Sequence, residues 1–186
     1  MEMDAWRRQA LESLERAARS LETVEMLGET SVNFRLSDIV SPDRASEIVT
    51  SLRRRCTAPA LAIYCFELVD PSGYPELRAS YARKPASCDS TGQKLSYSRL
   101  HEDAYPGAIY VGSSKSVVSR FSQHLGLTGG SGTSAMRLKQ WAAQHPFEIR
   151  TMVWFFAPDL DPQTLLLLEQ ALWDYKRPLL GKRSGH

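Results

Sequence analysis

The chain has 186 residues, 42% of them hydrophobic and 24% charged, and its 23 Lys and Arg side chains nearly balance its 21 Asp and Glu side chains for a net charge of +2. A chain of this length can bury a core of its own, and it holds no run near the roughly 18 apolar residues that cross a membrane. The small net charge excludes a molecule-wide positive field as a reason to expect a nucleic-acid partner.

Cysteine content and the N-terminal composition bear on the compartment. Cys56, Cys65 and Cys88 form an odd, widely spaced set that fits neither a disulfide framework nor a paired CxxC zinc site. Residues 1–20 are charged throughout and lack the apolar core of a secretory signal. We therefore expect a cytoplasmic protein with no membrane association.

The N-terminal third predicts helices. Apolar residues recur at three- and four-residue steps through residues 4–26, with charged residues between them, and Gly28 is a suitable stop. A second helix is expected around residues 42–55, where Asp38 or Ser41 offers an N-cap. We see no chemistry in these helices and expect them to form an extension packed on the rest of the chain.

The remaining elements alternate between strands and helices. Apolar, β-rich runs predict strands at residues 60–68, 108–112 and 147–157, and helical patterns cover residues 116–125 and 134–144. A last helix begins after Asp161-Pro162, an N-cap followed by proline, and must end before Pro178. This order predicts a small sheet covered by helices.

The segment between the first two strands, residues 69–107, is polar and mixes tyrosines with cationic side chains. Aromatic and cationic side chains together can hold nucleic acid by stacking and phosphate contact. We expect this segment to wrap a duplex through Arg83, Lys84 and Lys94. A solvated loop with a small hairpin is the alternative.

Tyrosines, a glycine corner and a serine cluster mark the first two strands. If the strands pair, alternation lets Tyr64 and Tyr110 share one face of the sheet, although a tyrosine in an apolar strand is commonly a core residue. Gly112 ends the second strand, and Ser113 or Ser114 can cap the helix that follows.

Three further side chains suit phosphate or metal chemistry. Arg120 and His124 lie one helical turn apart beside an apolar stripe, where an arginine can donate two hydrogen bonds to a phosphate; a surface arginine is the alternative. Glu169 projects from the most apolar face of its helix, and a buried carboxylate is costly unless it is paired or coordinates a metal. An arginine in the core is the alternative partner.

Taken in order, these motifs resemble the GIY-YIG nuclease superfamily: "AIY" and "YVG" in strands, a serine, then arginine and histidine on a helix, and finally "LLLLEQALWDYKRP". The resemblance covers roughly residues 60–180. It implies an α+β fold with a three-stranded antiparallel sheet flanked by helices. We accordingly expect a nuclease domain at residues 59–183 with an inserted loop at 69–107, preceded by a helical extension at 1–58.

The resemblance also implies roles for individual residues. Tyr64 and Tyr110 match the signature tyrosines, Arg120 the motif arginine, His124 the histidine that follows it in many members, and Glu169 the metal-binding glutamate. We expect Tyr110 to be the general base and Tyr64 its positioning partner, with the reverse assignment open, and a phenol near a metal and an arginine to be acidified.

The other expected contacts follow from the same motifs. Arg120 would neutralise the phosphate oxygens, while His124 would orient a water or contact the phosphate. Glu169 would hold one Mg²⁺ or Mn²⁺ per active site, since Mg²⁺ keeps several waters and needs only one or two carboxylates. Gly112, Ser114 and Lys115, beside the second motif, are expected to contact nucleic acid.

Three features depart from the family pattern. Ala62 stands where glycine is usual, the link between the tyrosine strands is much longer than a hairpin loop, and Leu179-Leu180-Gly181 lacks an asparagine that many members carry. None of them removes a residue assigned to the chemistry.

The sequence thus predicts a Mg²⁺-dependent endonuclease acting on DNA, double-stranded in the first instance, with RNA left open as a substrate. A homodimer would suit cleavage of both strands of a palindrome. The alternatives are a nucleic-acid-binding module on the same fold that does not cut, and an unrelated scaffold in which these side chains do not converge.

Overall fold

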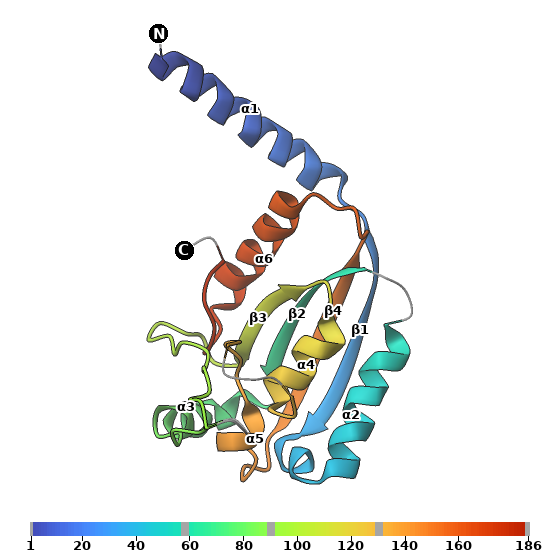
Figure 1. Ribbon diagram of the computed structural model, residues 1–186, viewed down its shortest axis with the longest axis vertical. Helices are drawn as coiled ribbons and strands as arrows, with labels where there is room; N and C mark the ends of the chain where they lie inside the picture. The colour runs from blue at the N-terminus through green and yellow to red at the C-terminus, as the bar shows by residue number, and fades with distance from the viewer. Residues whose placement is uncertain (1, 57–59, 89–91, 129–131, 185–186) are drawn as a thin grey trace.

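The chain folds around a four-stranded antiparallel sheet with the strand order β1-β4-β2-β3 (Figure 1). The strands are β1 (Met26–Arg35), β2 (Leu61–Leu68), β3 (Ala108–Ser114) and β4 (Glu148–Phe156). The computed structural model describes residues 2–56, 60–88, 92–128 and 132–184. Because β2 and β3 are neighbours, the two tyrosine-bearing strands lie side by side.

Helices connect and cover the strands. They are α1 (Glu2–Thr23), α2 (Pro42–Arg55), α3 (Tyr74–Ala82), α4 (Val117–Leu125), α5 (Leu138–Trp141) and α6 (Pro162–Lys176). Short 3₁₀ turns, η1 (Leu36–Val40) and η2 (Pro71–Gly73), precede α2 and α3. Figure 1 shows α1 extending away from the rest of the molecule, with α2 and α4 lying against the sheet.

Alternation along β2 divides the core between the two faces of the sheet. Tyr64 and Phe66 point to one face, where they join buried residues of α2 and α4, including Leu52 and Phe121. Leu61 and Ile63 point to the other face, which is covered by leucines of α6. The two helical layers thus exclude water from both faces of β2, and this strand is buried over nearly its whole length.

In the described part of the chain the sheet has four strands, so the prediction of a three-stranded sheet was wrong, although the α+β class with flanking helices is confirmed. The additional strand, β1, lies between the two helices predicted at residues 4–26 and around 42–55, in the segment that was expected to form a helical extension. Val32 and Phe34 are buried on one face of β1, and the residues between and after them, Asn33 and Arg35, are exposed. Residues 26–56 therefore share the sheet and core of the later segments, whereas 1–58 was expected to form a helical extension.

Several local predictions are confirmed. Asp161 Oδ2 accepts a hydrogen bond from the Thr164 N–H at 2.9 Å and caps α6, which ends at Lys176. Gly126 ends α4 in the left-handed region at φ 84°. The helix expected at 134–144 is wrong in extent, because only Leu138–Trp141 is helical.

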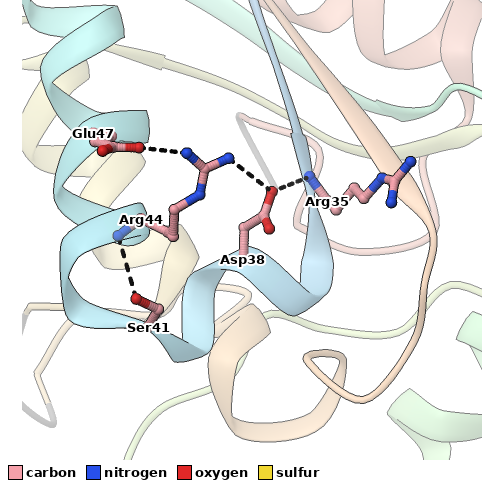
Figure 2. A network of polar contacts seen from close by, with 5 residues as sticks. All are labelled: Arg35, Asp38, Ser41, Arg44 and Glu47. Atoms are coloured by element: carbon pink, nitrogen blue, oxygen red, sulfur yellow. Dashed lines mark hydrogen bonds and ion pairs between the residues drawn. The ribbon is translucent and has the colours of Figure 1, made fainter.

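The turn from β1 into α2 is held by a small polar network (Figure 2). Ser41 Oγ accepts from the Arg44 N–H at 3.4 Å and is the N-cap of α2, while Asp38 Oδ2 accepts from the Arg35 N–H at 3.4 Å. The Arg44 side chain bridges Glu47 at 2.6 Å and Asp38 at 4.0 Å. These contacts fix α2 against the end of β1, where Ile48 and Leu52 enter the core.

The segment between β2 and β3 is more ordered than the loop that was expected. It contains η2 and α3, whose Tyr74, Leu77 and Tyr81 are buried, and a short bridge pairs Cys88 with Lys94. Within the described residues, none of the helices is long and apolar enough to span a membrane.

Candidate active site

Tyr64 and Tyr110 share one face at the β2–β3 pair. Tyr64 lies opposite Gly112 and Phe66 opposite Tyr110, so the two tyrosines are diagonal neighbours. Their rings stack with centroids 6.2 Å apart at an interplanar angle of 13°. A Cβ at position 112 would lie 2.8 Å from both Tyr64 Oη and Tyr110 Cε1. The glycine of the second motif is therefore required for the two rings to lie as they do.

His124 lies beneath the tyrosines rather than at the surface. It is fully buried on α4, with Nε2 3.1 Å from Tyr64 Oη and Nδ1 accepting from the Met136 N–H at 3.3 Å. Because Nδ1 is an acceptor, the hydrogen-bond pattern assigns the ring proton to Nε2, which donates to the tyrosine oxygen. Burial, with Arg120 and Arg137 nearby, holds the pKa of His124 well below its ordinary value.

The imidazole is therefore neutral and its ring nitrogens are engaged by Tyr64 and Met136. The expectation that His124 contacts the phosphate or a water does not fit this placement, since the first layer of side chains above it consists of the tyrosines. Its position instead suits holding Tyr64 in place.

Arg120 projects from α4 toward both phenols. Its guanidinium donates to Gln123 Oε1 at 2.5 Å and to the Ser134 carbonyl at 3.2 Å, which fixes its direction. Burial raises the pKa of Tyr64 and of Tyr110, and the neighbouring Arg120 cation opposes the shift without cancelling it. The protein alone thus keeps both phenols protonated, and acidification of a phenol beside a bound metal stays a prediction.

Glu169 approaches the same site from α6. Its side chain is 7% exposed, and each carboxylate oxygen accepts a hydroxyl hydrogen: Oε2 from Ser113 and Oε1 from Ser184, the latter at 2.5 Å. The partners of this carboxylate are thus neutral hydroxyls, and not the core arginine that was the alternative expectation. Among the residues with described positions, no cation forms an ion pair with this carboxylate.

These side chains meet at one open pocket of about 560 Å³. Four of the five expected catalytic residues line it, with His124 behind Tyr64. The lining residues are Tyr64, Tyr97, Ser98, Arg99, Tyr110, Gly112, Ser113, Arg120, Ser134, Glu169, Gly181, Lys182 and Ser184. Residues from β2, β3, α4, α6 and the segment after α6 thus converge although they are far apart in the sequence.

Arg99, Lys182, Ser113 and Ser184 line the pocket but were not selected from the sequence. Arg99 and Lys182 are exposed and belong to cationic clusters that the sequence does display, but no spacing distinguished them from their neighbours. Ser113 lies between Gly112 and Ser114, which were both expected to contact nucleic acid. Nothing near Ser184 in the sequence indicates a contact with Glu169.

The cations expected to wrap nucleic acid lie elsewhere. Arg83 Nε donates to the Ala79 carbonyl at 3.3 Å, and Lys84 Nζ lies 4.1 Å from the centroid of the Tyr81 ring. Both line a separate pocket of about 260 Å³ between α3 and α5. Lys94 takes part in the Cys88 bridge. None of the three lines the tyrosine pocket, and the wrapping of a duplex through these cations stays a prediction.

Gly112, Ser114 and Lys115 were expected to contact nucleic acid, but they do not all line the pocket. Gly112 lines the pocket, whereas Ser114 Oγ accepts from the Ser116 N–H at 2.9 Å and stabilises the turn before α4. Lys115 is exposed in that turn and does not line the pocket.

The donor set allows a test of the expected metal. The described part of the chain holds no group of three or more His, Cys, Asp or Glu side chains that could enclose an ion. A single carboxylate in a polar, open pocket fits Mg²⁺ or Mn²⁺, which retain waters, and does not fit a structural zinc site with four protein ligands.

Comparisons with models of protein families, with curated proteins and with solved structures found no match for this chain. A function for it has therefore to be inferred from its own residues and their geometry.

Proposed function

We propose that this protein is a metal-dependent endonuclease of the GIY-YIG type that hydrolyses DNA phosphodiester bonds. The observation that carries the proposal is the convergence of Tyr64, Tyr110, Arg120 and Glu169 on one pocket. Such a hydrolysis needs a base, a phosphate ligand and a ligand for a divalent cation. A phenol, the guanidinium and the carboxylate can fill these three roles, and the second phenol can hold the first in position.

Tyr110 is the proposed general base. It is half-buried and lines the pocket, whereas Tyr64 is 2% exposed and accepts a hydrogen bond from His124. Of the two phenols, Tyr110 is thus the one that a water molecule in the pocket reaches more easily. In its phenolate form Tyr110 accepts the proton of the attacking water, while Tyr64 and His124 keep its ring in place.

Arg120 and Glu169 divide the charge of the reaction between them. The Arg120 guanidinium neutralises the non-bridging phosphate oxygens in the transition state. Glu169 would hold the divalent cation, which would supply positive charge to stabilise the departing 3′ oxygen and to favour the phenolate of Tyr110. Arg99 and Lys182, exposed at the edge of the pocket, are suited to the flanking phosphates.

A non-catalytic nucleic-acid-binding module is the second candidate function. One observation favours it: burial raises the pKa of both tyrosines, so the protein alone presents neutral phenols and cations to a phosphate. Phosphate binding needs no phenolate. The two candidates therefore differ in whether a divalent cation turns binding into cleavage.

Supercoiled plasmid incubated with Mg²⁺ tests the proposal. We expect nicked or linear product from the unaltered protein, none after chelation with EDTA, and none from Glu169→Gln, which keeps the side-chain volume but removes the charge. Glu22→Gln, on the exposed part of α1, is the matched control. Retarded migration of DNA or RNA in a gel, without cleavage of either, would contradict the proposed nuclease and support the non-catalytic binding module.

Two further proposals follow from the same function. A homodimer would place two such sites on one duplex for double-strand cleavage. The cytoplasm is the proposed location, in keeping with Cys56, Cys65 and Cys88, which are free thiols.

A further inference from the structure

The carboxylate of Glu169 is held from two directions by serines of different segments. Ser113 comes from the end of β3, and Ser184 lies 15 residues beyond Glu169, after α6. Both hydroxyls donate, one to each oxygen. A carboxylate has about four lone-pair sites, so two hydrogen bonds leave acceptor capacity on each oxygen for a cation in the pocket.

Residues 179–184, here termed the C-terminal strap, are fixed by the sheet at their first half. The Leu179 and Leu180 N–H groups donate to the carbonyls of Ala108 and Ile109 at 3.0 and 2.8 Å. The Gly181 N–H donates to the Arg99 carbonyl at 2.9 Å. The strap thus makes two backbone hydrogen bonds to β3 and one to the segment that precedes it.

The second half of the strap is fixed by α6. Arg183 forms a two-pronged ion pair with Asp174, with Nε–Oδ1 2.8 Å and Nη2–Oδ2 2.7 Å. Gln170 Nε2 donates to the Ser184 carbonyl at 2.5 Å. The Ser184 hydroxyl is therefore held at Glu169 by contacts on both sides of it rather than by its own hydrogen bond alone.

The strap also passes against the proposed base. Gly181 has φ +127°, a conformation that favours glycine, and a Cβ there would lie 3.2 Å from Tyr110 Cε2. Its carbonyl is held by His101 Nε2 at 2.8 Å. One short segment thus contacts both the phenol and the carboxylate of the site.

We propose that Ser113 and Ser184 are positioning residues for Glu169, so that the C-terminal strap forms part of the divalent-cation site. The inference rests on the proposed function, because it gives Glu169 a cation to bind. Hydrogen bonds to a ligating side chain fix its orientation, and their removal typically weakens metal affinity by about 10- to 100-fold. Hydroxyl donors suit this role because they orient the carboxylate without neutralising its charge.

The test is calorimetric titration of the full-length protein with Mn²⁺, which reports binding without cleavage. We expect Ser113→Ala and Ser184→Ala each to weaken Mn²⁺ binding by about 10- to 100-fold. Ser184→Thr, which keeps the hydroxyl, should bind Mn²⁺ nearly as well as the unaltered protein. Ser13→Ala, on the exposed face of α1, is the control and should bind normally.

Plasmid cleavage gives a second measurement on the same variants. The Mg²⁺ concentration for half-maximal cleavage should rise for the two alanine variants, while the rate at saturating Mg²⁺ changes by less than about threefold. If the serines serve only folding, the melting temperature falls and the Mn²⁺ affinity of the folded fraction does not.

The outcomes separate the two proposals. Unchanged Mn²⁺ affinity in both alanine variants overturns the positioning role, and so does tighter binding, which would mean that the strap obstructs the ion. If those variants match an unaltered protein that binds Mn²⁺ and cuts DNA, only the positioning role fails. An unaltered protein that binds no Mn²⁺ at millimolar concentration and cuts nothing overturns the proposed function as well.

Discussion

At the scale of single residues, the site depends on how closely side chains approach one another at the β2–β3 pair. Gly112 leaves the space that the rings of Tyr64 and Tyr110 fill, and His124 supports Tyr64 from below. The shared face of the two tyrosines and the position of the glycine beside them could be predicted, because these residues lie in two short strand motifs, "AIY" and "YVG". The burial of His124 was not, because it depends on Met136 and on the strands above the helix.

Gly112→Ala tests the close approach. The added methyl group would meet Tyr64 Oη and Tyr110 Cε1 at 2.8 Å, so we expect the free energy of unfolding to fall by about 1–3 kcal/mol, as for overpacking in a core, and cleavage to fall at least tenfold. Gly28→Ala in β1 is the matched control, because a Cβ there meets nothing within 4 Å. Equal effects of the two substitutions in denaturant titrations would contradict the packing described here.

His124 predicts a dependence of stability on pH. Its pKa is held well below 6.5 in the folded chain, so between about pH 6.5 and 5 the unfolded chain binds a proton that the folded chain does not. Stability should therefore fall as the pH falls, by up to about 1.4 kcal/mol per pH unit from this residue. His124→Gln should lose that part of the slope in urea titrations across this range. Parallel slopes for the two proteins would show that His124 is not buried in its neutral form.

At the scale of elements, α4 and α6 were predictable because their caps are local. Asp161-Pro162 begins α6 and Gly126 ends α4, and both signals lie within a few residues of the helix. By contrast, β1 pairs with β4, more than 110 residues away, and its alternation of Val32 and Phe34 with polar residues is short. Its hydrogen-bond partner, rather than its own sequence, determines that it is a strand.

The prediction of a helix over residues 134–144 was wrong in extent for a related reason. Arg137 adopts a left-handed conformation at φ 54°, which interrupts a helix, and Ala135 instead forms a bridge with Tyr97. The residues before Leu138 therefore take their backbone partners from the segment between β2 and β3. Such long-range pairing is invisible in the local pattern of residues.

His145 ties α3 to the turn before β4. Its Nδ1 lies 2.9 Å from Glu76 Oε1 and its Nε2 lies 2.7 Å from Ser80 Oγ, so two residues one turn apart on α3 hold one imidazole. We expect His145→Ala to lower the free energy of unfolding by about 1–3 kcal/mol, since a buried imidazole loses two hydrogen bonds worth about 0.5–1.5 kcal/mol each, and to speed amide exchange in α3. Unaltered exchange across residues 74–82 would mean that other contacts hold this helix.

At the scale of the whole molecule, α1 extends away from the sheet (Figure 1). None of its described residues lines the tyrosine pocket. Its side chains are mostly exposed, and of residues 3–23 only Ala17, Ser20 and Leu21, near the end of the helix, are half-buried. The helix ends at Thr23, and the sheet begins three residues after it, at Met26. The fold and the site therefore belong to the chain from β1 onward.

Removal of residues 2–23 tests this division. Little apolar surface of α1 is buried, so we expect the free energy of unfolding to fall by less than about 2 kcal/mol and the rate of plasmid cleavage to stay within about twofold. Circular dichroism melts and the plasmid assay measure both. A shortened chain that does not fold would show that α1 stabilises the sheet.

The central claim is that Tyr110, Arg120 and Glu169 act as one site. The most direct test is the single-turnover cleavage rate of Tyr110→Phe, Arg120→Ala and Glu169→Gln, each alone and all three together. Residues that act as a unit give strongly non-additive losses, so the triple variant should be no more than about tenfold slower than the slowest single variant. Losses that multiply across the three substitutions, or single variants that cut as fast as the unaltered protein, would contradict the claim.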